Sequence, residues 1–192
     1  MNKVEKFATE IGYIKNPKYR ENIKILIDLL PDYFFEVAAS STGKYHPSFS
    51  LGAGGLLRHT KTAVRIAYEM FQDESISGAF NESEKDMMIM ALILHDGLKH
   101  GDPKEEYVKF DHPILICDRI RENKEKTTLT DNEILALTNM IESHMGPWNT
   151  NKYSDVVLPV PKNKYQKFVH MCDFLSSRKF LDVKFENDEI VI

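Results

Sequence analysis

The sequence predicts an all-α protein, a helical bundle that ends in a small β-hairpin. Most of its 192 residues fall into segments of helical length in which apolar residues recur every three or four positions. These segments begin and end at proline, glycine or capping residues, which are typical helix boundaries. Residues 180–192 instead alternate apolar and polar side chains on both sides of Asn187-Asp188, a pattern typical of a hairpin.

Particular residues predict where the helices begin and end. Pro17 opens one helix and Pro31 stops it, and Thr130 with Glu133 forms a capping box at the start of another. Serine and glycine fill residues 40–55, so we expect a long loop there, and a polar link at 75–81. The expected helices cover residues 3–11, 17–30, 32–39, 56–71, 82–98, 130–144 and 162–179, with one more that begins at 111–113.

The helix expected at 82–98 should lie at the centre of the bundle. Its run from Met87 to Leu94 is apolar on every side, which is typical of a helix buried all around. The run leads directly to His95 and Asp96, and Lys99 follows the Asp at a helical spacing of three. Buried polar groups need partners, and a bound metal ion would be one.

Composition limits the class of protein. The chain has 42% hydrophobic residues, which is ordinary for one globular domain spanning residues 1–192. No apolar stretch reaches the length of a membrane span and no signal-type segment begins the chain, so we expect a cytoplasmic protein. Cys117 and Cys172 fall in apolar helical patterns, and we expect both to be reduced core residues.

The formal net charge of −4 bears on the choice of partner. It argues against a groove for long nucleic acid, which usually needs a basic face. It does not argue against a small phosphorylated molecule, because two divalent cations would add positive charge where a phosphate binds. We therefore expect a small phosphorylated substrate and no membrane partner.

Six side chains with metal-binding groups lie at the apolar boundaries of the expected helices. Each one alone is ordinary, because a single His or Asp at a helix end is usually a cap or a surface residue. Together they supply neutral imidazoles and carboxylates, which suit Fe, Mn, Co, Ni or Zn. One shared carboxylate would suit two divalent ions with room for water and substrate. The six are His59, His95, Asp96, His112, His144 and Asp173.

The order of these six residues along the chain resembles that in the HD superfamily of metal-dependent phosphohydrolases. The resemblance extends to flanking residues. Gly-Gly-Leu-Leu-Arg-His-Thr at 54–60 looks like the family's entry to the first ligand helix, and residues 94–99 are similar to its His-Asp-x-Gly-Lys signature, with Gly97 and Leu98 exchanged. Residues 143–146 and 170–173 resemble motifs in the HD domain of a bacterial 3′→5′ exoribonuclease.

The resemblance implies a single HD-type domain with a core of about residues 38–178 and a hairpin at 180–192. It implies that His59, His95, Asp96 and Asp173 hold one metal ion, and that Asp96, His112 and His144 hold a second. A hydroxide held by the metals would attack the phosphorus. Asp96 and Lys99 would be the catalytic residues, since Asp96 bridges the metals and Lys99 stabilises charge on the phosphoryl oxygens.

Further side chains are candidates for contact with the substrate. Trp148 lies in the loop after the last ligand His and could stack on a base. We expect His170, one turn before Asp173, to support a ligand, and His100 to be exposed. The candidates for substrate binding besides Lys99 are His46, Arg58, Arg178 and Trp148.

We therefore expect a metal-dependent phosphohydrolase that cleaves a phosphomonoester, phosphodiester or phosphoanhydride of a nucleotide-like small molecule. Three alternatives stay open: a di-iron oxygenase of the HD fold, a 3′→5′ exonuclease-like activity on short oligonucleotides, and a single-metal hydrolase in which His112 and His144 line the pocket. The segment before Ala38 is too short for the nucleic-acid-binding module of the exoribonuclease, which argues against long polynucleotides. A homo-oligomer formed through the hairpin is compatible with the sequence.

Overall fold

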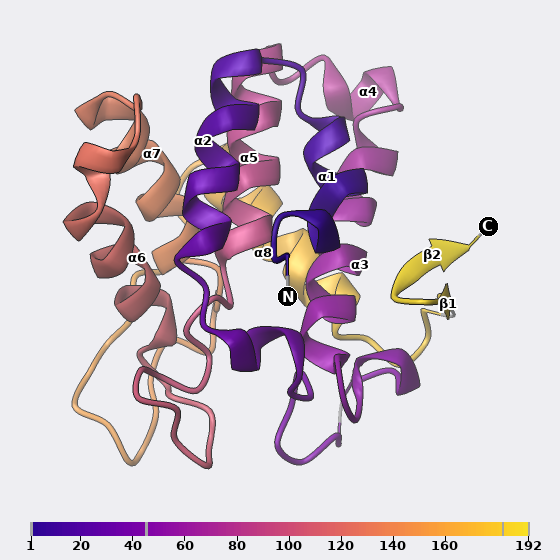
Figure 1. Cartoon of the computed structure of the whole chain (residues 1–192), viewed down its shortest axis with the longest axis vertical. Coiled ribbons are helices and arrows are strands. Elements are labelled where there is room, and N and C mark those ends of the chain that lie inside the picture. The colour runs from indigo at the N-terminus through magenta and orange to yellow at the C-terminus, as the bar shows by residue number, and fades with distance from the viewer. Residues whose placement is uncertain (1, 45, 182, 192) are drawn as a thin grey trace.

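The computed structural model describes residues 2–44, 46–181 and 183–191, and it confirms a mostly helical protein with a two-stranded hairpin at its C-terminal end (Figure 1). The α-helices are α1 (Ala8–Tyr13), α2 (Pro17–Asp28), α3 (Gly55–Met70), α4 (Glu74–Ser77), α5 (Glu82–Leu94), α6 (His112–Glu122), α7 (Asp131–Glu142) and α8 (Lys164–Ser176). The short 3-10 helices are η1 (Glu5–Phe7), η2 (Asp32–Phe35), η3 (Ser48–Ser50) and η4 (Lys124–Lys126).

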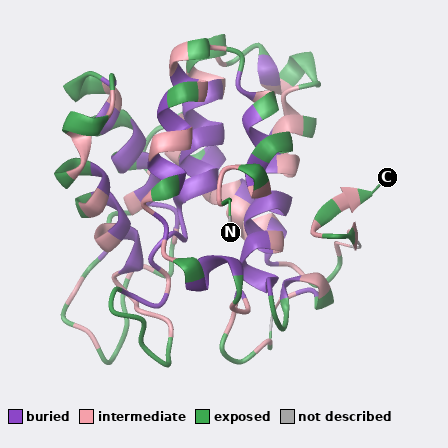
Figure 2. Cartoon of the chain, viewed as in Figure 1, coloured by how far each residue is buried: buried purple, intermediate pink, exposed green. Residues whose placement is uncertain are grey.

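Helix α5 is the central helix, as its apolar run predicts. Every residue from Asp86 to Leu94 is buried, and α2, α3, α7 and α8 pack around it (Figures 1 and 2). Asn81 begins the helix with a capping box, because its side chain accepts from the Glu84 N–H and the Glu84 carboxylate accepts from the Asn81 N–H. Because α5 is buried on all sides, polar groups that it presents lie at its ends.

Helix α5 ends at Leu94, before the expected end at residue 98. Beyond it the chain forms tight turns, in which the Gly97 N–H donates to Leu94 O and the Lys99 N–H donates to Asp96 O. Gly97 disfavours a helix and lies in close contact with the core, where an added Cβ would come within 2.6 Å of the Leu30 side chain. His95 and Asp96 therefore lie in the turn that follows the helix.

Other boundaries differ by a few residues. The segment expected to be helical at 32–39 forms only η2, and the link expected at 75–81 contains α4, which Asp73 caps through the Ser75 N–H. Helix α8 begins at Lys164 because Asn163 and Gln166 form its capping box. Thr130 and Glu133 form the predicted capping box of α7.

The C-terminal hairpin has the predicted turn. Strands β1 (Lys184–Glu186) and β2 (Glu189–Val191) pair antiparallel, and Asn187 and Asp188 take φ values of 50° and 65°. Asn and Asp tolerate this left-handed conformation better than other non-glycine residues. The expected hairpin also included residues 182 and 192, which lie outside the described residues.

Two further expectations concern the core and the membrane. Cys117 and Cys172 are buried free cysteines, as predicted. Among the described residues, no helix is long and apolar enough to cross a membrane.

Candidate metal centre

The six predicted ligands meet at one end of the bundle. His59 lies in the second turn of α3, His95 and Asp96 directly follow α5, and His112 is the first residue of α6. His144 lies two residues after α7, and Asp173 lies in the last turn of α8. The long loops of the chain gather at this same end, at the bottom of Figure 1.

Asp96 lies between two pairs of histidines, and each of its carboxylate oxygens faces one pair. Its Oδ2 lies 3.4 Å from His59 Nε2 and 3.5 Å from His95 Nε2. Its Oδ1 lies 3.0 Å from His112 Nε2 and 3.7 Å from His144 Nε2. Two groups of potential metal ligands therefore share Asp96, and within each group the ligand atoms all lie within 4.8 Å of one another.

Asp173 belongs to the first of these groups by position. Its Oδ1 lies 3.0 Å from His59 Nε2 and 3.3 Å from His95 Nε2. The structure therefore brings together all six predicted ligands, in a set of four and a set of three that share one carboxylate.

Hydrogen bonds at Nδ1 orient three of the four imidazoles. The Nδ1 atoms of His95, His112 and His144 lie 2.7, 2.6 and 2.7 Å from the carbonyl oxygens of Leu92, Lys109 and Ile141. A carbonyl oxygen only accepts, so each Nδ1 carries the proton and donates it. In the neutral ring this leaves a lone pair at Nε2, directed at Asp96.

Ser176 orients the fourth imidazole, and sequence reasoning missed it. The Ser176 hydroxyl donates its proton to Asp173 O at 2.7 Å, so it accepts from His59 Nδ1 at 3.1 Å. His59 is thereby held in the same tautomer as the other three histidines. Metal-ligating histidines commonly have such a partner at their second nitrogen, and the spacing of Ser176, one turn after Asp173, is the signal that could have identified it.

The donor set fits divalent metal ions. The Nε2 atoms of His112 and His144 lie 3.3 Å apart, and those of His59 and His95 lie 3.4 Å apart. In the described ranges of the chain, Asp96 Oδ1 is buried without a hydrogen-bond partner. Buried acceptors that face one another are costly unless a cation lies between them, and four imidazoles with two carboxylates suit the transition metals.

Burial and neighbouring charges set the protonation of the ligands. Burial alone would raise the pKa of Asp96, but the positive charge of Lys99 and the surrounding imidazoles outweigh it and hold the pKa well below its usual range. Burial likewise opposes ionisation of Asp173, yet the neighbouring imidazoles of His59 and His95 keep its pKa well below its usual value. Burial and the neighbouring His95 lower the pKa of His144 to about 3. Ionised carboxylates and a neutral imidazole are the forms that bind a metal.

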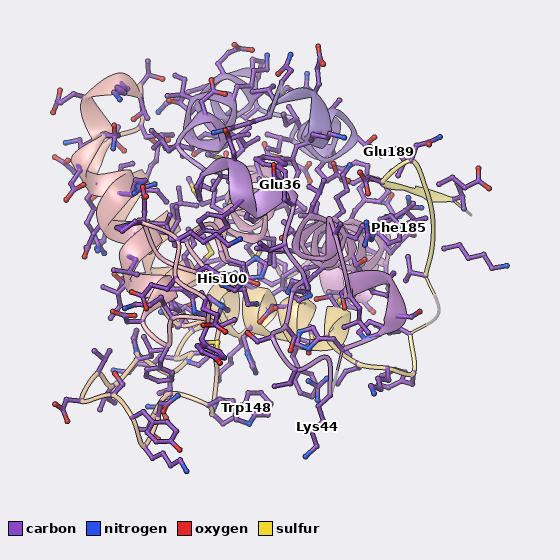
Figure 3. The ribbon with its side chains drawn as sticks, turned by 60° about the horizontal axis from the view of Figure 1, so that its bottom comes forward. Glu36, Lys44, His100, Trp148, Phe185 and Glu189 are labelled. Carbon is purple, nitrogen blue, oxygen red and sulfur yellow. The ribbon has the colours of Figure 1, made fainter. Side chains whose placement is uncertain are left out.

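A cavity of about 460 Å³ opens beside these ligands. Lys99, His46, Trp148 and Arg178, four of the candidates for contact with a substrate, all line it. Lys99 Nζ lies 2.5 Å from Asp96 Oδ2, and the buried Nδ1 of His46 has no hydrogen-bond partner among the described residues. Trp148 and Lys44 lie at the same end of the molecule (Figure 3).

Aromatic side chains form part of the cavity lining. The Trp148 indole stacks on Phe174, with ring centres 5.6 Å apart, and the Arg178 guanidinium carbon lies 4.3 Å from the centre of the Phe174 ring. His170 Nδ1 lies 2.6 Å from His144 O, so His170 contacts the backbone of one of the predicted ligands. The residues that the sequence did not single out as lining include Phe174, Val108 and the loop stretch 39–42.

Two predictions differ from the structure. Arg58 does not line the ligand cavity, because its guanidinium contacts loop carbonyls and Asp188 on another side of α3. The expectation that His100 is exposed is wrong. His100 is 6% exposed, its N–H donates to the Tyr33 hydroxyl and its ring packs edge-on against Tyr33.

Comparisons of this chain with models of protein families, with curated proteins and with solved structures found no match. A function for this chain therefore has to be argued from the geometry of the site.

Proposed function

We propose that this protein is a metal-dependent phosphohydrolase that acts on a small, nucleotide-like phosphoester or phosphoanhydride. One observation carries the proposal: a single buried carboxylate, Asp96, faces one histidine pair with each oxygen, and a lysine beside it lines an open cavity. Two divalent ions that share one carboxylate are a common arrangement for hydrolysing phosphoesters.

Each of the two sets of predicted ligands would hold one ion. His59, His95, Asp96 and Asp173 would hold one ion, and Asp96, His112 and His144 would hold the other. When bound, the ions would supply an activated water at neutral pH and neutralise charge on the phosphoryl oxygens.

The charges in the cavity support an anionic substrate. Apart from the ligand carboxylates of Asp96 and Asp173, the charged side chains that line it among the described residues are Lys99 and Arg178, both cations. Lys99 lies beside the shared ligand, where its ammonium can stabilise charge that grows on the phosphoryl oxygens. Arg178 is a second donor suited to a phosphate or carboxylate.

The size and lining of the cavity support a small organic group on that phosphate. A cavity of about 460 Å³ is within the range of small-molecule sites. The Trp148 indole is 51% exposed although it stacks on Phe174, so it offers aromatic surface to a planar group such as a base.

The test is a hydrolysis assay on protein prepared anaerobically and loaded with Mn, Co, Fe, Ni or Zn. A panel of nucleoside mono-, di- and triphosphates, cyclic nucleotides and dinucleotides is assayed for phosphate or nucleoside release. We expect Lys99→Met to lower kcat by about a hundredfold, as loss of one transition-state donor does. Lys179→Met is the matched control, because this exposed neighbour of Arg178 does not line the cavity.

Two outcomes would contradict the proposal. One is hydrolysis of no panel member with any metal. The other is oxygen consumption by an iron-loaded protein that hydrolyses nothing, which would place the chain with the oxygenases that use the same ligand types.

A further inference from the structure

The Arg58 side chain donates hydrogen bonds to three carbonyl oxygens of the loop that precedes α3. Its Nε donates to Phe49 O at 2.5 Å, and its Nη2 donates to Leu51 O at 3.1 Å and to Ala53 O at 2.8 Å. The side chain is only 17% exposed. Hydrogen bonds from a charged donor are stronger than neutral ones, so this guanidinium fixes the path of residues 49–53.

Residues 49–53 are joined by a hydrogen bond to a segment that lines the cavity. We call residues 39–44 and 46–54 the wall loop. Ser50 O accepts from the Ala39 N–H at 3.0 Å, and residues 39–42 and His46 line the cavity. Ser50 O also lies close to the start of α3, where a Cβ on Gly55 would come within 2.2 Å of it. Arg58 is thus linked to the cavity lining through the backbone of the wall loop.

The C-terminal hairpin holds Arg58 from the other side. Asp188, in the hairpin turn, places Oδ1 3.0 Å from Arg58 Nη1. Phe185 in β1 packs against Phe49 of the wall loop, with ring centres 5.5 Å apart. Figure 3 labels Phe185 and Glu189, which lie with the hairpin at the edge of the molecule.

A second ion pair fastens the hairpin one turn further along α3. Glu189 Oε1 lies 2.8 Å from Lys61 Nζ, and the Lys61 ammonium also pairs with the buried Glu10 at 3.0 Å. Lys61 is fully buried, so this contact ties the hairpin to the core. Two consecutive carboxylates of the hairpin, Asp188 and Glu189, therefore form ion pairs with Arg58 and Lys61. These two cations lie three residues apart on α3, the helix that also carries His59.

We propose that Arg58 is a positioning residue through which the C-terminal hairpin holds the wall loop, and with it His46, against the substrate. The proposal rests on the proposed function for the identity of that substrate. The role differs from direct phosphate binding by Arg58, because all three guanidinium nitrogens are already engaged by carbonyl oxygens and a carboxylate.

The test uses Arg58→Gln and Asp188→Asn in the full chain. Asn keeps the left-handed turn conformation that Asp188 adopts, so Asp188→Asn removes charge without changing the turn. Glu186→Gln is the matched control, since it removes the same charge from an exposed position of the same hairpin. Each variant is measured for amide hydrogen exchange, for Mn and Zn affinity, and for kcat and KM on the best substrate of the panel.

We expect exchange in residues 46–54 to rise about tenfold in Arg58→Gln and about threefold in Asp188→Asn, because local opening becomes easier there. We expect KM to rise about fivefold in Arg58→Gln with kcat within about twofold, since the wall loop contributes binding and not chemistry. Metal affinity should change by less than about twofold in either variant, because the ligands keep their own orienting bonds. The double variant should be no worse than Arg58→Gln alone, because both changes break one chain of contacts.

Exchange is read without any substrate, so its result separates this proposal from the proposed function. Unchanged exchange in the wall loop of both variants would overturn the positioning role even in an active enzyme. A large loss of kcat in Arg58→Gln with a wild-type Asp188→Asn would overturn it in favour of direct phosphate contact. Faster exchange in a protein that hydrolyses nothing would support the hairpin contact and contradict the proposed function alone.

Discussion

The two ends of the helical bundle have cavities of similar size, but they differ in whether their polar side chains are hydrogen-bonded. The cavity at the ligand end measures about 460 Å³, and a second cavity, lined by Asn81, Glu133 and Asn163 among others, measures about 500 Å³. This second cavity lies where α2, α5, α7 and α8 begin, and we call it the cap end.

At the cap end, the polar side chains are occupied with helix starts. Helices α5, α7 and α8 each have a full capping box, and Asn16 caps α2 through the Lys18 N–H. Glu133 accepts from Thr130, Lys18 and Tyr19 together. Such side chains satisfy the amide groups that every helix start leaves unpaired.

At the ligand end, some buried polar atoms are left unpaired. Within the part of the chain that the structure describes, Asp96 Oδ1 and His46 Nδ1 have no hydrogen-bond partner, and paired Nε2 atoms face each other at 3.3 and 3.4 Å. Hydrogen bonds at Nδ1 hold the four imidazoles of the predicted ligands in this orientation. The two ends are not distinguished by cavity volume. They are distinguished by whether their polar groups are hydrogen-bonded, and this difference supports the proposal that the ligand end is a metal site.

The largest effect should follow from Asp96→Asn. An amide in place of the shared carboxylate removes a ligand from both sets, so we expect loss of both ions and a fall in hydrolysis of more than about a thousandfold. Metal content and the hydrolysis rate measure this. Glu133→Gln, a matched change at the cap end, should keep its ions, and an Asp96→Asn protein that retains two ions per chain would break the comparison.

A smaller effect is expected for Ser176→Ala, which leaves all six ligands in place. It removes the acceptor that orients His59, so the first ion should bind about ten to a hundred times more weakly, as is usual when such a partner is lost. Competition with a coloured chelator measures the affinity. Ser83→Ala, at the cap-end cavity, should bind both ions as the wild type does, and equal affinities in the two variants would contradict the role of Ser176.

Glu133, at the cap end, should make the stability of the protein depend on pH. Although burial opposes it, hydrogen bonds from Lys18, the Thr130 N–H and Tyr19 lower the pKa of Glu133 from 4.5 to about 2. The folded pKa lies below the unfolded one, so the stabilisation is present above about pH 4.5 and is lost as pH falls towards 2. With allowance for partial solvent screening, Glu133→Gln should remove about 1 to 2 kcal/mol of unfolding free energy at pH 6. Urea unfolding of both proteins from pH 6 to pH 2.5 measures it, and a constant difference across this range would contradict the assignment.

The smallest effect is expected for Asn81→Ala. Loss of the cap on α5 should cost about 1 kcal/mol of unfolding free energy. Metal affinity and hydrolysis should not change, because α5 presents its ligands at the opposite end. Thermal unfolding with and without Zn tests both parts, and a variant that loses metal affinity would show that the two ends are not independent.

Local sequence signals predicted helix starts better than helix ends. Thr130 with Glu133 and Asn187-Asp188 act within a few residues, so the capping box of α7 and the hairpin turn could be predicted. The end of α5 at Leu94 depends on how closely Gly97 packs against Leu30, a contact made across the core. Gly97 alone is a local signal against a helix, but its packing against Leu30 could not be predicted from a local pattern.

The same distinction holds for the candidate site. The six ligand candidates could be proposed because each lies at the apolar boundary of an expected helix, and the ends of those helices meet. The direction of Arg58 depends on Asp188, and the burial of His100 depends on Tyr33, both of which are distant in sequence. The loop at 40–55 could be predicted from its composition, but its attachment to the hairpin through Arg58 could not, because that attachment is made by long-range contacts.

Metal stoichiometry tests the central claim most directly. The purified chain is stripped with a chelator, reloaded with Mn or Zn, freed of excess metal and analysed for metal and protein content, next to His112→Ala and His144→Ala. We predict two ions per chain in the wild type and one in each variant. One ion in all three proteins would contradict the two-ion centre, and no bound ion in the wild type would contradict a metal site altogether.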